Sequence, residues 1–387
     1  INPRFEVSFW GMEFALPHFG KGASLPVACL PLLAALTPAE HSITLMDENV
    51  EPLDYERLAR ADIVGLTGMS VQRFRMTEIL ERLKEQGSFT IVGGPWVTVQ
   101  EDYFGELADV IFVGEAEDTW PLFLREWAAG THQTRYEQSQ PTDMSKVPCP
   151  RYDLLPSHRY LIGSMQFSRG CPFDCEFCDI IILNGRKPRV KPRAQVHAEL
   201  QALYDAGWRR NIFVADDNFY GNKKRCRELL EAIVEWRDAH KRPFVLATQS
   251  SLNMADDPGL LDLMVRAGFA AVFIGLESVS PASLAECHKV QNLKRSMSRS
   301  LATIHAHGLT VWGGFVIGFD SDTETIFDAQ MEFIEESEIA LATVSLLSAI
   351  PHTQLYDRLK AEGRLLGRFS GGIVDASGLN FVPRMDR

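Results

Sequence analysis

Ser168-Arg169-Gly170-Cys171-Pro172-Phe173-Asp174-Cys175-Glu176-Phe177-Cys178-Asp179 is the stretch around which this chain of 387 residues is organised. It places three cysteines within eight residues, at spacings of four and three. Three thiolates can hold three irons of a cubane iron–sulfur cluster and leave the fourth iron open to a small ligand. The spacing therefore predicts a catalytic cluster with Cys171, Cys175 and Cys178 as its ligands.

Zinc and disulfides are the other interpretations of these cysteines. A structural zinc site needs four ligands, and the next Cys or His residues after Cys178 are His197 and Cys226, both in predicted helices. Disulfides would leave one of the seven cysteines unpaired, and they are typical of small secreted domains. The cluster is favoured over both alternatives.

Composition limits the class of protein. The net charge of −12 argues against a nucleic-acid partner, which needs a basic surface. The sequence has no run of about 18 apolar residues that could span a membrane, and Ile1–Gly20 lacks the basic-then-apolar pattern of a secretory signal. We therefore expect a cytoplasmic protein with no transmembrane segment. Because the chain begins with Ile rather than Met, we also expect the natural N-terminus to lie upstream.

Residues 1–130 alternate strand and helix signals. Segments 42–47, 62–67, 90–94 and 109–115 are predicted as strands, and 25–36, 55–60, 77–86 and 119–127 as helices. Segment 5–10 is predicted as a first strand or an extended lead-in. This alternation predicts a Rossmann-like, doubly wound α/β domain, in which ligands bind beyond the carboxyl ends of the strands. The candidate ligand-binding residues at those ends are Thr67, Gly68, Ser70, Gly94, Pro95, Gly114 and Glu115.

Residues 131–160 are polar and rich in proline, which predicts a linker. From 161 to 365 a strand–helix pattern repeats six times, with strands predicted at 165–168, 211–215, 244–248, 271–275, 310–318 and 341–347. The repetition predicts a partial (β/α)6 barrel of parallel strands with its chemistry at their carboxyl ends. Those ends carry the cysteine loop and polar residues, for which helix capping is the structural alternative; they include Asp217, Gln249, Glu277 and Ser278.

The CxxxCxxC spacing, with Phe177 just before the last cysteine, resembles the radical S-adenosylmethionine (radical SAM) superfamily. The resemblance implies a [4Fe-4S] cluster that binds S-adenosylmethionine (SAM) and cleaves it to a 5′-deoxyadenosyl radical. It also implies an electron donor such as flavodoxin or ferredoxin. The segments VADDNF, IGLESVSP and GGFVIGFDSDT resemble SAM-contacting motifs of the family. The residues expected to contact SAM are Phe177, Asp217, Gln249, Glu277, Ser278 and Gly314.

The order of segments in residues 1–130 resembles the cobalamin-binding domain that precedes many radical SAM cores. The matching pieces are LMDENVEP, ADIVGLTGMS, TIVGGPWVT and VIFVGEAEDTWPLF. The resemblance implies that the strand-end residues of this domain bind cobalamin. The DxHxxG motif of cobalamin methyltransferases is absent, with Asp47–Glu51 in its place, so we expect no histidine on the lower face of the corrin. The alternative is a degenerate domain that binds nothing and packs on the barrel.

The segment GLNFVPRMD, within residues 366–387, resembles the start of a C-terminal extension in a subgroup that includes hopanoid methylases. We therefore expect the part that shapes the substrate site to continue beyond this chain. The leading hypothesis is a cobalamin-dependent radical SAM methyltransferase that acts on an unactivated carbon of a small-molecule or lipid substrate. Two alternatives are a radical SAM enzyme of cyclisation, rearrangement or coupling, and a non-catalytic iron–sulfur sensor or scaffold.

Overall fold

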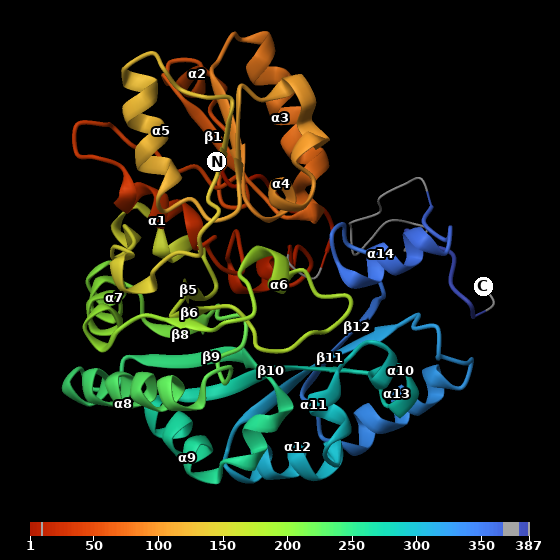
Figure 1. Ribbon diagram of the computed structural model, residues 1–387. Coiled ribbons are helices and arrows are strands. Elements are labelled where there is room, and N and C mark those ends of the chain that lie inside the picture. Colours follow the sequence, from red (N-terminus) through yellow and green to blue (C-terminus); the bar gives the residue numbers. More distant parts are fainter. Residues whose placement is uncertain (9–10, 367–378, 386–387) are drawn as a thin grey trace. The chain divides into compact units, whose positions relative to one another are not determined.

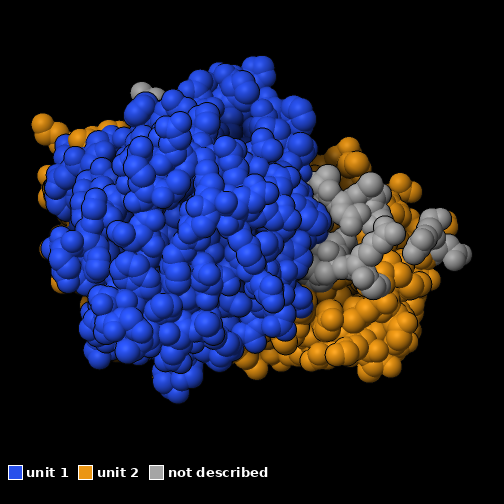
Figure 2. Space-filling model, turned by 90° about the horizontal axis from the view of Figure 1, so that it is seen from above, with its two compact units in different colours: residues 1–164, 198–208 blue, residues 165–197, 209–387 orange. Residues whose placement is uncertain are grey.

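The computed structural model describes residues 1–8, 11–366 and 379–385. The chain divides into two compact units, which Figure 2 shows in different colours. The first unit comprises residues 1–164 and 198–208, and the second comprises 165–197 and the described part of 209–387. Residues 131–160, predicted as a linker, lie within the first unit. In the described ranges, no helix combines the length and the apolar character needed to cross a membrane.

The first unit is built on a parallel sheet of four strands in the order β1-β2-β3-β4. The strands are β1 (Val64–Thr67), β2 (Thr90–Gly93), β3 (Val110–Val113) and β4 (Arg135–Glu137). The first three confirm predicted strands, whereas β4 arises from the segment predicted as a linker and pairs with β3. The helices are α1 (Cys29–Leu36), α2 (Tyr55–Leu58), α3 (Arg73–Glu85), α4 (Pro95–Val99) and α5 (Thr119–Ala128).

Two extended segments continue this sheet beyond β1. Thr67 N donates to the Ile1 carbonyl oxygen, and Asn2 N donates to that of Met46 at 2.8 Å. The chain order of neighbouring segments therefore reverses between the N-terminal residues and β1. The predicted strand at 42–47 is reduced to a single bridge at Asp47. Residues 5–8 form no strand, so of the two predictions for 5–10 the first strand is wrong there, while residues 9–10 lie outside the described residues.

Aromatic packing holds the first unit together. Phe112 of β3 stacks on Tyr136 of β4, with ring centroids 5.2 Å apart, and meets Phe123 of α5 edge-on at 5.5 Å. Phe123 is fully buried, so α5 seals one face of the sheet. The other face is covered by α3, whose Ile79 and Leu83 are fully buried. A sheet with a helix layer on each face is typical of α/β folds.

The second unit is built on a six-stranded sheet in the order β12-β11-β10-β9-β8-β5. Its strands are β5 (Gly163–Met165), where the two units meet along the chain, β8 (Arg210–Val214), β9 (Phe244–Ser250), β10 (Phe269–Glu277), β11 (Thr310–Ile317) and β12 (Leu341–Leu346). β8 to β12 pair in parallel. The strand order follows the chain order without reversal, so each strand–helix unit adds to one edge of the sheet.

Helices connect these strands, and Figure 1 shows α8, α9 and α12 along one side of the sheet. The helices are α6 (Ile180–Leu183), α7 (Arg193–Asp205), α8 (Lys223–Ala239), α9 (Pro258–Ala267), α10 (Pro281–Glu286), α11 (Val290–Leu293), α12 (Met297–Ala306), α13 (Ile326–Glu336) and α14 (Gln354–Ala361). Capping explains several starts: the side chains of Asn222, Ser280 and Thr353 accept hydrogen bonds from the first turns of α8, α10 and α14. Because β8 to β12 are parallel, their carboxyl ends lie at one edge of the sheet. Most of the candidate site residues lie at or after these ends.

Candidate active site

The cysteine loop begins at a short antiparallel ladder of β6 (Ser168–Arg169) with β7 (Arg189–Val190). Gly170 follows β6 with φ +98°, in the left-handed region. A Cβ atom there would lie 2.8 Å from the Lys187 carbonyl oxygen and 3.0 Å from that of Gly185. Glycine is therefore required where the chain turns into the loop.

Two carboxylates that follow β8 hold the start of this loop. Asp216 is fully buried and accepts hydrogen bonds from Phe167 N at 2.7 Å, Ser168 N at 2.9 Å and Ser168 Oγ at 2.7 Å. Asp217 Oδ2 accepts from Gly170 N at 2.6 Å and Asn184 Nδ2 at 2.9 Å. Burial raises the pKa of both carboxyl groups, that of Asp216 to about 6. Asp217, which was predicted to contact SAM, thus binds the backbone directly before Cys171.

The three cysteines lie in the loop between β6 and α6 of the second unit. Cys175 is buried, and Cys171 and Cys178 are half-buried. Asn218 Nδ2 lies 3.6 Å from Cys171 Sγ, and Gln291 Nε2 lies 3.9 Å from Cys175 Sγ. Burial raises the pKa of the Cys175 and Cys178 thiols. Such sulfurs become thiolates when positive charge or metal offsets the cost of burial.

The donor set of the cysteine loop suits an iron–sulfur cluster. All seven cysteines lie in the described ranges, and none forms a disulfide. Among the described residues, no three His, Cys, Asp or Glu side chains are close enough to share one metal ion. A cubane cluster needs only one thiolate for each of three irons. Cys171, Cys175 and Cys178 meet that requirement, with amide donors beside two of the sulfurs.

A buried ion pair lies beside the cysteines. Lys289 Nζ donates to Glu277 Oε1 at 2.6 Å, and both side chains are about nine-tenths buried. Burial alone would lower the pKa of Lys289, but the Glu277 carboxylate and the Cys175 thiolate outweigh it and raise the pKa above its usual value. The lysine is thus a fixed positive charge that interacts with Cys175. Sequence reasoning missed this lysine.

Glu277 itself is held in an uncommon conformation. It ends β10 with φ +66°, and the register with β11 shifts between Gly275 and Glu277. A non-glycine residue at positive φ is uncommon and is found at functional sites more often than elsewhere. Asn292 Nδ2 donates to the carbonyl oxygens of Gly275 at 3.2 Å and Leu276 at 3.1 Å, and so supports this bulge.

The other predicted SAM contacts are spread along the same strand ends. Ser278 is buried, and its Oγ accepts a hydrogen bond from Ser280 N at 3.1 Å. The half-buried Gln249 lies in β9 opposite Phe273 of β10. Gly314, in β11, makes room for the Phe273 ring, which a Cβ atom would contact at 2.7 Å. Phe177 packs with Phe319, their ring centroids 6.1 Å apart.

In the first unit, the structure brings together most of the predicted strand-end residues. Gly94 has φ +98°, and a Cβ atom there would overlap the Thr67 hydroxyl. Trp96 N, in the first turn of the helix that begins at Pro95, donates to the Gly68 carbonyl oxygen at 3.2 Å. Thr98 Oγ1 joins the next strand end by accepting from Gly114 N at 3.0 Å.

The two remaining residues of that set lie at its margins. The Ser70 carbonyl oxygen accepts from Arg73 Nη1 at 2.6 Å. Glu115 Oε2 accepts from Thr142 N at 2.8 Å, so this carboxylate ties the third strand end to a following loop. The edge formed by Thr67, Gly68 and Gly94 lies where the neighbouring chain order reverses, which is where α/β sheets bind ligands.

The sequence is similar to known protein families and to individual relatives. Residues 165–333 match the radical SAM superfamily, and residues 353–387 match a domain of unknown function, DUF4070. The chain is 40% identical over 384 residues to an uncharacterised methyltransferase of Synechocystis sp., a match that covers 99% of this chain and 72% of the relative. It is 36% identical over 374 residues to the hopanoid C-2 methylase of Rhodopseudomonas palustris, covering 95% and 70%.

Solved structures show the same fold. The radical SAM methyltransferase TsrM from Kitasatospora setae, with tryptophan and a SAM analogue bound, matches with a TM-score of 0.75 and 17% identity, over 87% of this chain and 74% of that one. OxsB, with aqua-cobalamin and SAM bound, matches with a TM-score of 0.73 and 17% identity, over 96% and 63%. The sequence relatives and the three-cysteine site lead to one conclusion: the chain belongs to the radical SAM superfamily of enzymes, among relatives that are methyltransferases.

Proposed function

We propose that this enzyme is a cobalamin-dependent radical SAM methyltransferase that adds a methyl group to an unactivated carbon. The observation that carries the proposal is the pairing of the three-cysteine loop with a buried lysine and glutamate at the adjacent strand end. When bound, the cluster and SAM supply an adenosyl radical, and cobalamin supplies the methyl group. The residues of the chain would bind these cofactors and orient them.

Cys171, Cys175 and Cys178 would hold the cluster. The fixed positive charge of Lys289 suits the carboxylate of SAM and offsets the negative charge of the thiolates. Glu277 uses Oε1 for Lys289 and has a second oxygen that can accept from a ribose hydroxyl. Ser278, Gln249, Gly314 and Phe177 would form the rest of the SAM site, and Asp217 would act mainly through Gly170.

The first unit would bind cobalamin as a Rossmann-like, doubly wound domain of residues 1–130. Support comes from the reversal of chain order beside β1, and from the small residues Thr67, Gly68 and Gly94 that follow the strands there. Ser70, Pro95, Gly114 and Glu115 complete the proposed contacts. We propose that residues 161–365 form a partial (β/α)6 barrel, with 131–160 as the connection and 366–387 as the start of an extension.

The substrate would be a small molecule or lipid, and a hopanoid is the first to test, because the relative at 36% identity is named for it. An electron donor such as flavodoxin or ferredoxin would reduce the cluster. Both fit a cytoplasmic enzyme.

Anaerobic reconstitution with iron, sulfide and hydroxocobalamin tests the proposal. After desalting, we expect a corrin absorption band together with the broad cluster absorption, and a change in the EPR spectrum of the reduced cluster when SAM is added. Turnover should release both S-adenosylhomocysteine and 5′-deoxyadenosine and add one methyl mass to the substrate. Cluster absorption without a corrin band would overturn the cobalamin part. A cluster that ignores SAM would overturn the enzymatic assignment.

A further inference from the structure

The segment that follows β12 contacts the cysteine loop at several points. Leu355 N donates to the Glu176 carbonyl oxygen at 3.0 Å, and Gln354 Nε2 donates to Asp174 Oδ1 at 3.1 Å. Phe177 packs against an apolar cluster that includes Leu355, Leu359 and Phe381. The residues between the cysteines are therefore held by residues about 180 positions later in the sequence.

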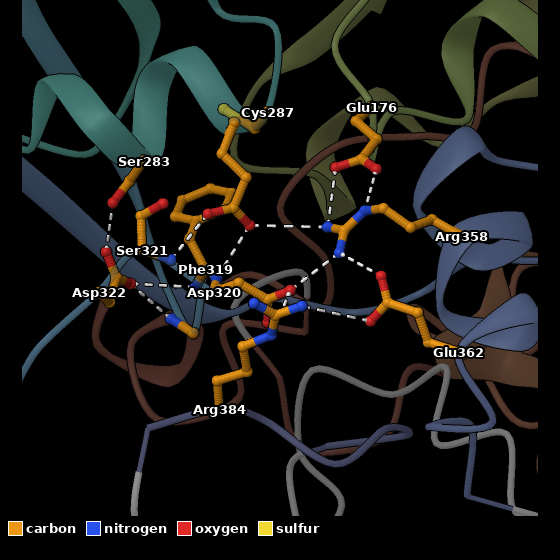
Figure 3. A network of polar contacts seen from close by, with 12 residues as sticks. Glu176, Ser283, Cys287, Phe319, Asp320, Ser321, Asp322, Arg358, Glu362 and Arg384 are labelled. Atoms are coloured by element: carbon orange, nitrogen blue, oxygen red, sulfur yellow. Dashed lines mark hydrogen bonds and ion pairs between the residues drawn. The ribbon is translucent and has the colours of Figure 1, made fainter.

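Arg358 of α14 makes the strongest of these contacts (Figure 3). Its Nε donates to Glu176 Oε1 at 2.5 Å and its Nη2 to Glu176 Oε2 at 3.1 Å. Its Nη1 donates to Asp320 Oδ2 at 2.8 Å. One guanidinium thus binds a carboxylate from the cysteine loop and a carboxylate that follows β11. A planar fork of this kind fixes distance and direction, which a lysine cannot do.

The Asp320 end of this bridge is itself rigid. Asp320 N and Ser321 N donate to the Glu286 carboxylate at 2.9 and 2.7 Å. Asp322 accepts from Gly318 N at 2.9 Å and Phe319 N at 3.0 Å. Residues 318–322 therefore form a fixed support directly after β11, the strand that contains Gly314, which is expected to contact SAM.

Glu176 lies directly after Cys175 and two residues before Cys178, so movement of its side chain and backbone displaces two cluster ligands. Its carboxylate is 8% exposed, and its backbone is held from both sides, because Glu176 N also donates to the Cys287 carbonyl oxygen at 3.0 Å. Glu176 therefore connects α14 to the part of the loop between Cys175 and Cys178.

We propose that residues 353–366 and 379–385, which lie in the segment of unknown function, form a clamp on the cysteine loop, with Arg358 as its positioning residue. The clamp sets the distance between the cluster ligands and the end of β11, the strand whose Gly314 is expected to contact SAM. This inference rests on the proposed function, since the distance matters only if SAM spans the two. The role proposed for the DUF4070 segment is therefore to position the cysteine loop.

The clamp is tested first by hydrogen–deuterium exchange of the full chain, on peptides that cover residues 170–180. Arg358→Met keeps the length of the side chain but removes both hydrogen bonds to Glu176. We expect about tenfold faster exchange in this segment, the scale of one lost charge-assisted hydrogen bond. Arg384→Met is the matched control: Arg384 lies in the same segment and near Asp320, at 3.5 Å, but its ion pairs are with Asp320 and Glu362. It should leave the exchange unchanged.

The reconstituted enzyme supplies the second readout. In Arg358→Met we expect iron to be released to a ferrous chelator about tenfold faster, a smaller EPR change on addition of SAM, and a KM for SAM raised more than kcat is lowered. Arg358→Lys should resemble Arg358→Met, because the fork and not the charge positions Glu176. If Arg358→Met folds poorly, Arg358→Lys, with its charge retained, decides the question.

The two hypotheses fail in different ways. Exchange in Arg358→Met or Arg358→Lys that equals that of the wild type would overturn the clamp, whatever the cluster does. An Arg384→Met variant as perturbed as Arg358→Met would also overturn it, because loss of any network charge would then suffice. A wild-type cluster whose EPR spectrum ignores SAM would overturn the proposed function instead, while the exchange result would still decide the clamp.

Discussion

The cysteine loop is held at its two ends by different kinds of contact. Before Cys171, the carboxylates of Asp216 and Asp217 accept hydrogen bonds mainly from backbone N–H groups, in a fully or largely buried place. Between Cys175 and Cys178, the contact is an ion pair of Glu176 with Arg358, whose side chain is 29% exposed. The first contact comes from the adjacent strand, and the second from the far end of the chain.

This difference indicates that one contact stabilises the loop and the other positions it. Buried carboxylate–amide bonds are costly to break and little screened by salt, so they stabilise the fold of the loop. A partly exposed ion pair adds little to stability but fixes geometry through its fork. We therefore expect changes at Asp216 to act on the free energy of unfolding, and changes at Arg358 to act on the cluster.

The largest effect is expected for Asp216→Ala. This change leaves three buried donors without an acceptor, two backbone amides and the Ser168 hydroxyl. Each such donor costs roughly 1–3 kcal/mol, so the three together could cost about 3–9 kcal/mol. Because the effects of neighbouring groups do not add fully, we expect a loss of about 3–5 kcal/mol in the free energy of unfolding, measured by urea denaturation. Asp216→Asn keeps one acceptor oxygen and should lose less. A loss below about 1 kcal/mol for the alanine variant would show that this contact is not the stabilising one.

The pH dependence of stability should come next in size. Burial raises the pKa of Asp216 from 3.8 to about 6 in the folded protein, so the folded form binds this proton more tightly than the unfolded form. Stability contributed by this group is therefore lost as pH rises from about 4 to about 6, by about 3 kcal/mol.

Asp216→Asn removes this titration and is the control. The free energy of unfolding of the wild type minus that of Asp216→Asn should fall between pH 4 and pH 6 and stay level above about pH 7. A difference that rises with pH would mean that the three donors keep the carboxylate ionised in spite of its burial.

Two glycines of the same loop sharpen the comparison further. Gly170 and Gly185 both have positive φ, +98° and +76°, but only Gly170 has carbonyl oxygens against its missing Cβ atom. Gly185→Ala should cost about 1 kcal/mol from conformation alone. Gly170→Ala should cost about 2 kcal/mol more, because backbone must move to make room. Equal losses in urea denaturation would show that the close approach is not a constraint.

Salt should produce the smallest effect, and only at the Arg358 end. We expect the rate of iron release from the reconstituted wild type to rise about two- to threefold between 50 and 500 mM NaCl, because a partly exposed ion pair is screened. Arg358→Met should show no such rise. An identical salt response in both proteins would place the sensitivity elsewhere.

Much of the fold was predictable because the strands and helices have local patterns of apolar and polar residues. The strands at β1, β2, β3 and β8 to β12 are apolar runs between turn residues, and periodicity locates such runs. Residues 5–8 alternate in the same way but form no strand, because alternation does not say whether a partner strand is in reach. β4 was hidden in a polar, proline-rich segment, since edge strands need little apolar character.

The site was predictable in part. The three cysteines follow from spacing alone, and Glu277 from its place at a strand end. Lys289 could not be assigned, since nothing local marks a lysine as buried, and only the fold brings its ammonium to Glu277. Arg358 is 182 positions from Glu176, a pairing that no local pattern reveals. Asp217 was predicted from its place after a strand, but its contact with Gly170 depends on a turn that only the structure shows.

The strand order of the second unit has a consequence for biosynthesis. Because each strand adds to one edge in chain order, the cysteine loop and its Asp216 contact can form early, while Arg358 leaves the ribosome about 180 residues later. A nascent chain therefore offers its thiols on a loop that is fastened at one end only. The contact between Glu176 and Arg358 can form only after Arg358 has been synthesised.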